Sequence, residues 1–340
     1  MVTVGMLSHR NNPETVFKSY AYAAAAKMEG VNFYFFSPGR VNFKNRTIRG
    51  WVYENGQWLE KSMPFPDVIY NASPPMTEKQ EKIIDKLSAA IPFTSHPIGN
   101  KIYVHQKIKR AKTFAQYLIP SMEISKVEDV FEFLNSHQDI VMKPLNGHKG
   151  EDILFVQKKS ETFIVRKDER QIMNAPELKD LIERLIKDEG YLIQAYIPSK
   201  TRAGFSYNLR LHVQKDGAGE WNLTTIFPCI TLQGIVANLN SDGYTIMFDD
   251  FLKQEFGDDA YNVKRYLEQF AIHFSEHFDG LYDEPLDELG IDVGLDSNQK
   301  IWIFEVNWRP GTPPTFSLEL DVAKQMIRYA RYLAETASRQ

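Results

Sequence analysis

Two short runs near the C-terminal end constrain the fold more than any other part of the sequence, because every second side chain in them is apolar. They are residues 290–295 and 301–307. They predict a β-hairpin with a two-residue turn at Asn298 and Gln299. In this register one face carries only apolar pairs: Ile291 with Val306, Val293 with Phe304, and Leu295 with Trp302. The other face pairs Gly290 with Asn307, Asp292 with Glu305, and Gly294 with Ile303. Because a slip of one residue would turn every apolar side chain away from the core, the pattern specifies which residues share a face.

The polar face of the hairpin places two carboxylates opposite each other. The β-carbons of Asp292 and Glu305 would lie about 4.5–5.5 Å apart, which destabilises a sheet unless a cation lies between them. Asn307 follows Glu305 by two residues and points to the same side, so carboxylate and amide oxygens are available to Mg²⁺. The sequence therefore predicts a metal site at Asp292, Glu305 and Asn307, with Gly290 and Gly294 leaving room for phosphates beside it.

Other acidic residues of this region are given simpler interpretations. Asp296 is interpreted as a turn residue and Asp287 as a surface residue. The alternative for the whole polar face is an acidic hairpin surface that is partly solvated and holds no metal.

The N-terminal part, residues 1–95, opens with a βαβ pattern. An apolar run at 2–7 precedes an Ala-rich helical stretch at 16–28 and a second β-rich run at 31–36. This predicts a small Rossmann-like domain, in which residues 67–70 form a further strand. No G-x-G-x-x-G motif follows the first strand, so we do not expect dinucleotide binding.

The rest of the chain is expected to form two α+β subdomains, at 96–190 and 191–340, because 340 residues exceed what one hydrophobic core supports. Residues 92–99 are interpreted as the boundary after the first domain. The remaining predicted helices lie at residues 78–87, 101–117, 127–134, 176–187, 261–278 and 318–335. The predicted strands are 121–124, 139–143, 152–157, 191–194, 205–214 and 220–230.

Composition excludes several classes of partner. The sequence has 40 Lys and Arg against 44 Asp and Glu, so no excess of positive charge indicates nucleic acid or an anionic membrane. Cys229 is the only cysteine, which excludes an internal disulfide and predicts a buried thiol in a reducing compartment. No run approaches the roughly 18 apolar residues of a membrane span. We therefore expect a cytoplasmic protein that binds neither nucleic acid nor membrane.

Several motifs together resemble the ATP-grasp superfamily. They are the Asp…Glu-x-Asn-x-Arg ending, Met142-Lys143-Pro144 before a glycine loop, and Gln194-Ala-Tyr-Ile197. Residues 207–213 and 234–238, with the hairpin, are similar to the YheC/YheD type, known as endospore coat-associated proteins. The resemblance covers residues 96–340 and, more loosely, 1–95. It implies a mixed α/β and α+β chain: a Rossmann-like domain followed by an ATP-grasp fold that holds ATP between two α+β subdomains.

The resemblance also implies an ATP site. Lys101 and Lys143 would bind phosphates, and an ammonium at the end of an apolar strand, as at Lys143, needs an anionic partner. The backbone of the loop at 146–150, with Gly147 and Gly150, would cover the triphosphate. The segment Gln194, Ala195, Tyr196 and Ile197 would contact adenine, with main-chain groups of Ala195 and Ile197 reaching the base.

Two arginines are matched to catalysis by the same resemblance. Arg210 and Arg309 would stabilise the transferred phosphoryl group or the acceptor, because a guanidinium holds phosphate or carboxylate with two parallel hydrogen bonds. ATP and Mg²⁺, with two ions, are the expected ligands. Three positions depart from the pattern: Glu151-Asp152 follow the glycine loop, Asn208 precedes Arg210, and residues 238–243 lack the usual basic pair.

The function implied is a ligase that joins a carboxylate to an amine through an acylphosphate. An amino acid added to a peptide or a spore coat protein is the expected product. Two alternatives are open: an ATP-binding scaffold for coat assembly with little catalytic activity, and a kinase on the same fold. The acceptor is expected near residues 198–206 and 230–245.

Overall fold

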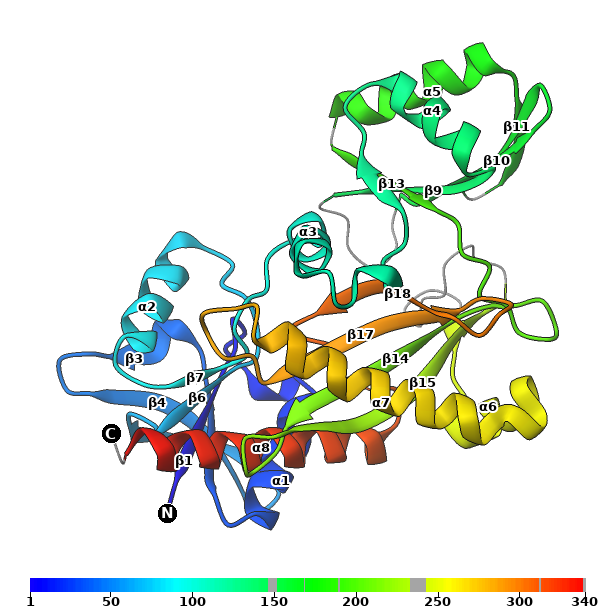
Figure 1. Cartoon of the computed structure of the whole chain (residues 1–340). Coiled ribbons are helices and arrows are strands. Elements are labelled where there is room, and N and C mark those ends of the chain that lie inside the picture. The colour runs from blue at the N-terminus through cyan, green and yellow to red at the C-terminus, as the bar shows by residue number, and fades with distance from the viewer. Residues whose placement is uncertain (146–151, 168, 189, 233–242, 312, 339–340) are drawn as a thin grey trace.

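The protein forms three β-sheets with eight α-helices around them among the residues described in this computed structural model, 1–145, 152–167, 169–188, 190–232, 243–311 and 313–338. Figure 1 shows the second sheet and its helices standing apart from the other two sheets, which share the lower part of the molecule. The predicted mixture of α/β and α+β architecture is confirmed.

The first sheet has a parallel centre and an antiparallel edge. The parallel strands are β1 (Thr3–Leu7), β2 (Asn32–Phe36), β6 (Val68–Asn71) and β7 (Phe93–Thr94), in the order β2-β1-β6-β7. The antiparallel part is β3 (Val41–Asn42), β4 (Thr47–Glu54) and β5 (Gln57–Pro64). The strands and the helix predicted for the N-terminal part are thus present.

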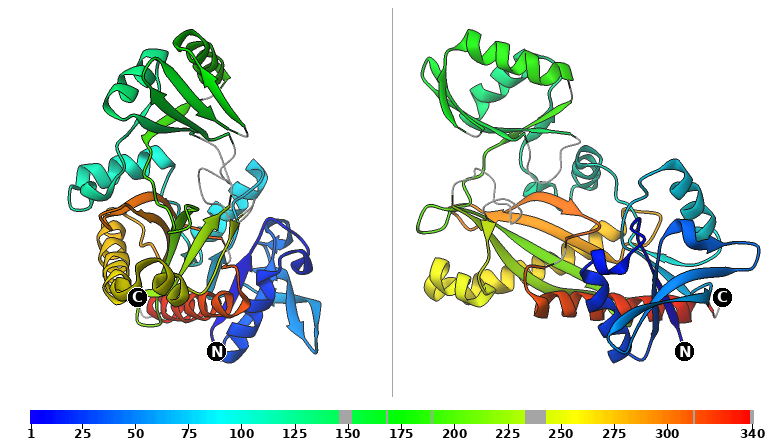
Figure 2. Two further views of the ribbon diagram at one scale, coloured as in Figure 1. Left: turned by 90° about the vertical axis from the view of Figure 1, so that its right-hand side faces the viewer. Right: turned by 180° about the vertical axis from the view of Figure 1, so that it is seen from behind.

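Each face of this sheet packs against a different set of helices, because side chains alternate along the strands. Val4 and Met6 face α1 (Lys18–Met28) and α8 (Phe316–Ala337). Leu7 and Tyr34 lie in a separate core with Leu87 of α2 (Glu78–Ser88). The two ends of the chain therefore build one core, which Figure 2 shows as α8 lying along the N-terminal strands.

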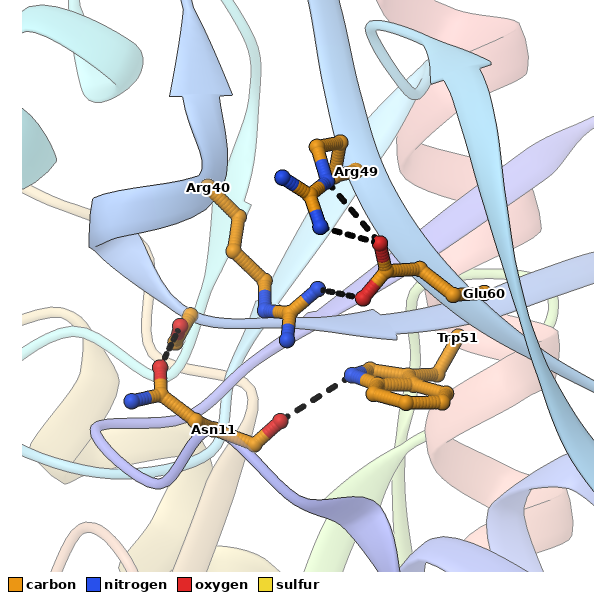
Figure 3. Close-up of polar contacts among 6 residues, drawn as sticks. Asn11, Arg40, Arg49, Trp51 and Glu60 are labelled. Carbon is orange, nitrogen blue, oxygen red and sulfur yellow. Dashed lines mark hydrogen bonds and ion pairs between the residues drawn. The ribbon is translucent and has the colours of Figure 1, made fainter.

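The antiparallel edge is tied to the loop that follows β1. The carbonyl of Asn11 accepts a hydrogen bond from Trp51 Nε1 at 3.0 Å, and the side chain of Asn11 accepts one from Ser37. Arg40 and Arg49 both contact the carboxylate of Glu60 on β5, as Figure 3 shows. These contacts hold the loop at the carboxyl end of β1 in one position.

The second sheet is antiparallel and is covered by helices on one face only. Its order is β12-β11-β10-β9-β13-β8, with bounds Ser121–Glu123 (β8), Asp139–Pro144 (β9), Leu154–Lys159 (β10), Thr162–Arg166 (β11), Arg170–Met173 (β12) and Tyr191–Ala195 (β13). Ile140, Met142 and Ile193 pack on α4 (Val127–Ser136) and α5 (Ala175–Asp188). Lys143 and Gln194 therefore project from the face without helices.

The third sheet has the order β16-β15-β14-β17-β18 and also has two unlike faces. Its strands are β14 (Ser206–Lys215), β15 (Trp221–Thr231), β16 (Gly243–Tyr244), β17 (Glu288–Leu295) and β18 (Ile301–Asn307). The apolar face packs on α7 (Ala260–Asp279) and α6 (Phe248–Phe256), a helix that the sequence analysis missed. The polar face carries Arg210, His212 and Gln214 of β14.

Helix α3 (Lys101–Ala111) connects the first sheet to the second and ends earlier than predicted. The predicted helix extended to Tyr117, but Lys112 adopts φ of 68°, which breaks the helix before the short 3₁₀ turn at Ala115–Tyr117. The other predicted elements are present with ends shifted by one to a few residues. No helix among the described residues is long and apolar enough to cross a membrane.

Candidate functional site

The predicted hairpin is β17 and β18, and its register is correct at the polar end. Asp292 pairs with Glu305, Gly290 with Asn307 and Ile291 with Val306. Beyond Asp292 the register shifts by one residue at a β-bulge. Val293 therefore pairs with Ile303, Gly294 with Trp302 and Leu295 with Ile301, so the three pairs predicted there are wrong.

The shift arises because the turn is longer than two residues. The Asp296 N–H donates to the Lys300 carbonyl at 3.2 Å, and Gln299 adopts φ of 60°. The Asp296 carboxylate accepts from the N–H groups of Asn298 and Lys300 and from Trp302 Nε1. Asp296 is thus the turn residue that was predicted. The extra loop residue is taken up by the bulge, which leaves the polar end of the hairpin in the predicted register.

The two glycines of the hairpin make room for protein side chains, contrary to the prediction that they leave space for phosphates. A β-carbon on Gly290 would lie 2.5 Å from Pro310 Cβ and 3.1 Å from Arg210 Cδ. A β-carbon on Gly294 would overlap the ring of Phe304. Glycine is required at both positions because neighbouring side chains already fill the space.

Arg210 and Asp292 form a buried ion pair across β14 and β17. Arg210 Nε lies 2.5 Å from Asp292 Oδ1, and Nη2 lies 2.9 Å from Oδ2. Burial raises the pKa of Asp292, and the Arg210 charge acts against this rise. Burial acts to lower the pKa of Arg210, but the Asp292 carboxylate more than offsets this and raises it.

Each of the two facing carboxylates has a cationic neighbour from the protein. Arg210 neutralises Asp292, and Lys101 Nζ on α3 lies 3.5 Å from Glu305 Oε1. The repulsion expected between these carboxylates is therefore relieved in part by protein cations, and the metal site stays a prediction. Hard oxygen donors for Mg²⁺ are nevertheless present, because Glu305 is about one-third exposed and Asn307 lies beside it. The Asn307 amide donates to Asp292 Oδ2 at 3.4 Å, so all three predicted metal ligands lie together.

Lys143 and Gln194 extend this cluster from the second sheet. Lys143 Nζ donates to Gln194 Oε1 at 3.0 Å. Burial lowers the pKa of Lys143 to about 8, with Glu305 and Asp292 raising it and Lys101 lowering it. The four charged side chains Lys101, Lys143, Asp292 and Glu305 come from α3, the second sheet and the third sheet, and they are close enough to influence one another.

In the segment predicted to contact adenine, residues 194–197, two main-chain N–H groups already donate hydrogen bonds within the protein. The N–H of Ala195 donates to the Pro120 carbonyl and that of Tyr196 to the Asp139 carbonyl, both at 2.9 Å. The N–H groups of Ala195 and Tyr196 are therefore already used within the protein, and the predicted contact of Ala195 with the base stays a prediction for its carbonyl. Among the described residues no acceptor is recorded for the Ile197 N–H, so Ile197 stays a candidate donor. Gly147 and Gly150 lie outside the described residues, as do 233–242 of the predicted acceptor region.

Arg309 follows β18 and has different charged neighbours from Arg210. Its guanidinium stacks on the Trp308 ring at 3.7 Å. Burial lowers the pKa of Arg309 to about 10, and the nearby Tyr70 and Glu288 act to raise it, so the group is charged at neutral pH. The two predicted catalytic arginines thus lie at different places on the polar face.

The sequence analysis missed a buried polar network between them. His212 Nε2 lies 2.8 Å from Glu288 Oε1, and Gln214 Nε2 donates to Glu288 and to the Val322 carbonyl of α8. His212 and Glu288 are 0% and 5% exposed. Glu288, Gly290 and Asp292 alternate along β17, so the rule that identified Asp292 could also have identified Glu288.

Asp287 was predicted to be a surface residue and is instead buried, at 4% exposure. Its carboxylate accepts a hydrogen bond from the Ser95 N–H at 2.6 Å, which ties β17 to the first sheet. Burial and then the Glu288 charge raise the pKa of Asp287 to about 7. Within the described residues no three His, Cys, Asp or Glu side chains form a metal cluster.

Comparison with known proteins places this geometry in a family. A family model described as YheC/D like ATP-grasp matches residues 90–333. The endospore coat-associated protein YheC of Bacillus subtilis (strain 168) is 23% identical over 368 residues, covering 100% of this chain and 98% of the relative. YheD of the same organism is 25% identical over 324 residues, covering 89% of this chain and 70% of the relative.

Solved structures with a similar fold include an ATP-grasp ligase and a synthetase. The ligase PsnB, complexed with minimal precursor, Mg and ADP, has a TM-score of 0.57 at 11% identity, covering 98% of each chain. D-cycloserine synthetase DcsG has a TM-score of 0.55 at 13% identity, covering 98% of this chain and 99% of the other. These likenesses show the fold.

Proposed function

The chain belongs to the YheC/D-like ATP-grasp family, and on that premise we propose that it is an Mg²⁺-ATP-dependent carboxylate–amine ligase. One observation carries the proposal: Lys101, Lys143, Asp292 and Glu305 meet although they come from different parts of the chain. Two cations and two carboxylates gathered from separate elements are suited to a nucleotide triphosphate and its metal ion.

Each group in this cluster has a part in holding ATP. Lys101 and Lys143 would contact phosphate oxygens, and the lowered pKa of Lys143 reflects a desolvated ammonium that gains from a phosphate partner. Glu305 and Asn307, with Asp292 beside them, would hold Mg²⁺, and two ions are expected. Bound there, the metal would neutralise charge on the β- and γ-phosphates.

The reaction proposed proceeds in two steps. An oxygen of the substrate carboxylate attacks the γ-phosphorus, and the bond between the γ-phosphorus and the bridging β-phosphate oxygen breaks. The products of this step are ADP and an acylphosphate. The nitrogen of an amine then attacks the acyl carbon, phosphate leaves, and the amine loses a proton to give an amide. Arg210 lies beside Asp292 and Glu305, where a fixed positive charge would stabilise the transferred oxyanions.

The biological product is proposed from the relatives. Both B. subtilis relatives are named as endospore coat-associated proteins. We propose that this protein adds an amino acid to a peptide or a coat protein in the cytoplasm, in association with the forming spore coat.

The test is ADP release with hydroxylamine as the amine. Hydroxylamine converts any acylphosphate into a hydroxamate, so the natural amine need not be known. Purified protein with Mg²⁺-ATP and a panel of carboxylates should release ADP and form hydroxamate. Glu305→Gln should abolish both, whereas Glu335→Gln, an exposed position on α8, should not. ADP release that is identical in the Glu305→Gln variant would exclude the proposed site.

One observation favours a second candidate, an ATP-binding scaffold with little turnover. Arg210 already neutralises Asp292, so a site that holds nucleotide without catalysis is chemically reasonable. Tight Mg²⁺-ATP binding by calorimetry, with neither ADP nor hydroxamate formed, would support that alternative. A stable phosphorylated product that hydroxylamine does not intercept would instead indicate a kinase.

A further inference from the structure

The two lysines of the candidate nucleotide site belong to different parts of the fold. Lys101 on α3 lies 3.5 Å from Glu305 of β18, whereas Lys143 belongs to the second sheet. Figure 1 shows that the second sheet stands apart from the third sheet. The distance between the two ammonium groups therefore depends on how the chain passes from α3 into the second sheet.

Helix α3 is anchored to the core of the third sheet. Val104 and Ile108 on this helix are both buried in that core. Lys101 and His105 lie four residues apart, so they follow one stripe along the helix, next to the stripe of Val104 and Ile108. His105 thus projects from a helix whose position is fixed by packing against the third sheet.

His105 joins this helix to the beginning of the second sheet. Its Nε2 lies 3.0 Å from Oγ of Ser121, the first residue of β8. Burial lowers the pKa of His105, a hydrogen bond to the Ile119 backbone acts to raise it, and the charges of Lys109 and Lys143 lower it. An uncharged imidazole has one donor and one acceptor nitrogen, so it can hold both Ser121 and the Ile119 backbone.

The contact between His105 and Ser121 leads directly to the second lysine. Ser121 pairs with Gln194 across β8 and β13. The Gln194 side chain accepts a hydrogen bond from Lys143 Nζ at 3.0 Å. Adjacent groups thus connect α3, which carries Lys101, with the strand that carries Lys143.

We propose that His105 is a positioning residue of the nucleotide site, which holds the start of the second sheet against α3 so that Lys101 and Lys143 reach the same nucleotide. This inference rests on the proposed function, because it takes the cluster of lysines and carboxylates to be the ATP site. His105 acts through the two lysines, and its loss should weaken the binding of ADP because the lysines no longer hold their spacing.

The experiment measures the affinity of the full chain for ADP by calorimetry in the presence of Mg²⁺. His105→Phe keeps a planar ring but removes both hydrogen bonds, and it should weaken ADP binding by about 10-fold. His105→Gln keeps a side chain that can hydrogen-bond to Ser121 and should retain most of the affinity. His273→Phe, at an exposed position on α7, is the matched control and should bind ADP as wild type does. An affinity of His105→Phe equal to that of wild type would overturn the proposal.

A double-mutant cycle separates positioning from a general effect on the fold. When Lys143 has already been replaced by Met, adding His105→Phe should weaken ADP binding by less than about twofold, because the lysine that it positions is gone. A further loss of about 10-fold in the Lys143→Met background would show that His105 does not act through Lys143, and would overturn the proposal. Urea denaturation shows whether each variant is folded. If His105→Phe is not folded, the same cycle is measured with Ser121→Ala, which removes only the hydroxyl that His105 contacts.

Failure of this inference can be told apart from failure of the proposed ligase. Coupling between His105 and Lys143 in ADP binding, without any hydroxamate formation, supports the positioning role and counts against the ligase. Hydroxamate formation together with an ADP affinity that His105→Phe leaves unchanged overturns the positioning role and leaves the ligase standing.

Discussion

The Arg210 guanidinium donates two hydrogen bonds to the Asp292 carboxylate across neighbouring strands, at 2.5 and 2.9 Å. The pair is almost fully enclosed, with side chains that are 19% and 9% exposed. A buried pair of this kind contributes little net stability, but removing one partner leaves an uncompensated charge. The pair therefore controls both the folding of the third sheet and the charge of the candidate metal site.

Replacing Arg210 should destabilise the protein strongly. Arg210→Met leaves Asp292 buried beside Glu305 without its partner, and we expect a loss of about 3–5 kcal/mol in the free energy of unfolding. Urea denaturation followed by circular dichroism would measure this. The double variant Arg210→Met with Asp292→Asn should recover much of the loss, because no buried charge then lacks a partner. A double variant as unstable as the single one would contradict this explanation.

The binding of ADP should weaken as pH rises through about 8. Burial lowers the pKa of Lys143 to about 8, and only its charged form attracts phosphate. The affinity for ADP, measured by calorimetry, should fall about fivefold between pH 8 and pH 9 if one proton is required, because the charged fraction falls from about one half to about one tenth. Lys143→Arg keeps the charge and should remove this dependence. A similar decline in Lys143→Met would mean that another group titrates.

The stability of the protein should also depend on pH through Lys143 itself. Its pKa in the folded state lies below the ordinary value of 10.5, so the folded state binds fewer protons between about pH 8 and 10.5. This single contribution makes folding more favourable as pH rises through that window. The difference in the free energy of unfolding between wild type and Lys143→Met, measured by urea denaturation, should be smaller at pH 9.5 than at pH 7.5. If this difference in the free energy of unfolding is the same at both pH values, the titration of Lys143 does not cause the pH dependence of stability.

The titration of Asp287 should make the protein less stable as pH rises through about 7. Burial raises its pKa to about 7, so its contribution is fully present below the ordinary value of 3.8 and is lost as pH rises through 7. Asp287→Asn keeps an oxygen that can accept from the Ser95 N–H. The variant should be more stable than wild type by about 1–3 kcal/mol at pH 8, with a smaller difference at pH 5. Calorimetric unfolding at both pH values would check this. An equal gain in the free energy of unfolding at pH 5 and pH 8 would mean that the raised pKa of the buried Asp287 carboxyl is not its cause.

Gly290→Ala should disturb the site without changing any charge. The added methyl group would lie 2.5 Å from Pro310 Cβ and 3.1 Å from Arg210 Cδ, so Arg210 must move. Overpacking of this kind costs about 1–3 kcal/mol in the free energy of unfolding, and ATP-dependent hydroxamate formation should fall with it. Gly39→Ala is the matched control, because nothing lies within 4 Å of its added β-carbon. Equal effects of the two substitutions would show that the close approach is unimportant.

Short-range patterns predicted most of the secondary structure and the centre of the candidate site. The alternation in β17 and β18 placed Asp292, Glu305 and Asn307 on one face, and the predicted pairs Asp292–Glu305 and Gly290–Asn307 are observed because the bulge offsets the longer turn. It failed beyond Asp292 because the length of the turn depends on how Asp296 binds the backbone of Asn298 and Lys300. The alternation of polar and apolar residues does not predict those hydrogen bonds.

The sequence by itself determined which side chains share a face, because side-chain direction along a strand depends only on local alternation. It therefore identified the carboxylates and the amide of the third sheet. Only the tertiary structure decided that Arg210 neutralises Asp292 and that Lys101 approaches Glu305. These contacts join residues far apart in the chain. They exist because β14 pairs with β17, which brings Arg210 opposite Asp292, and because α3 packs beside β18, which brings Lys101 to Glu305.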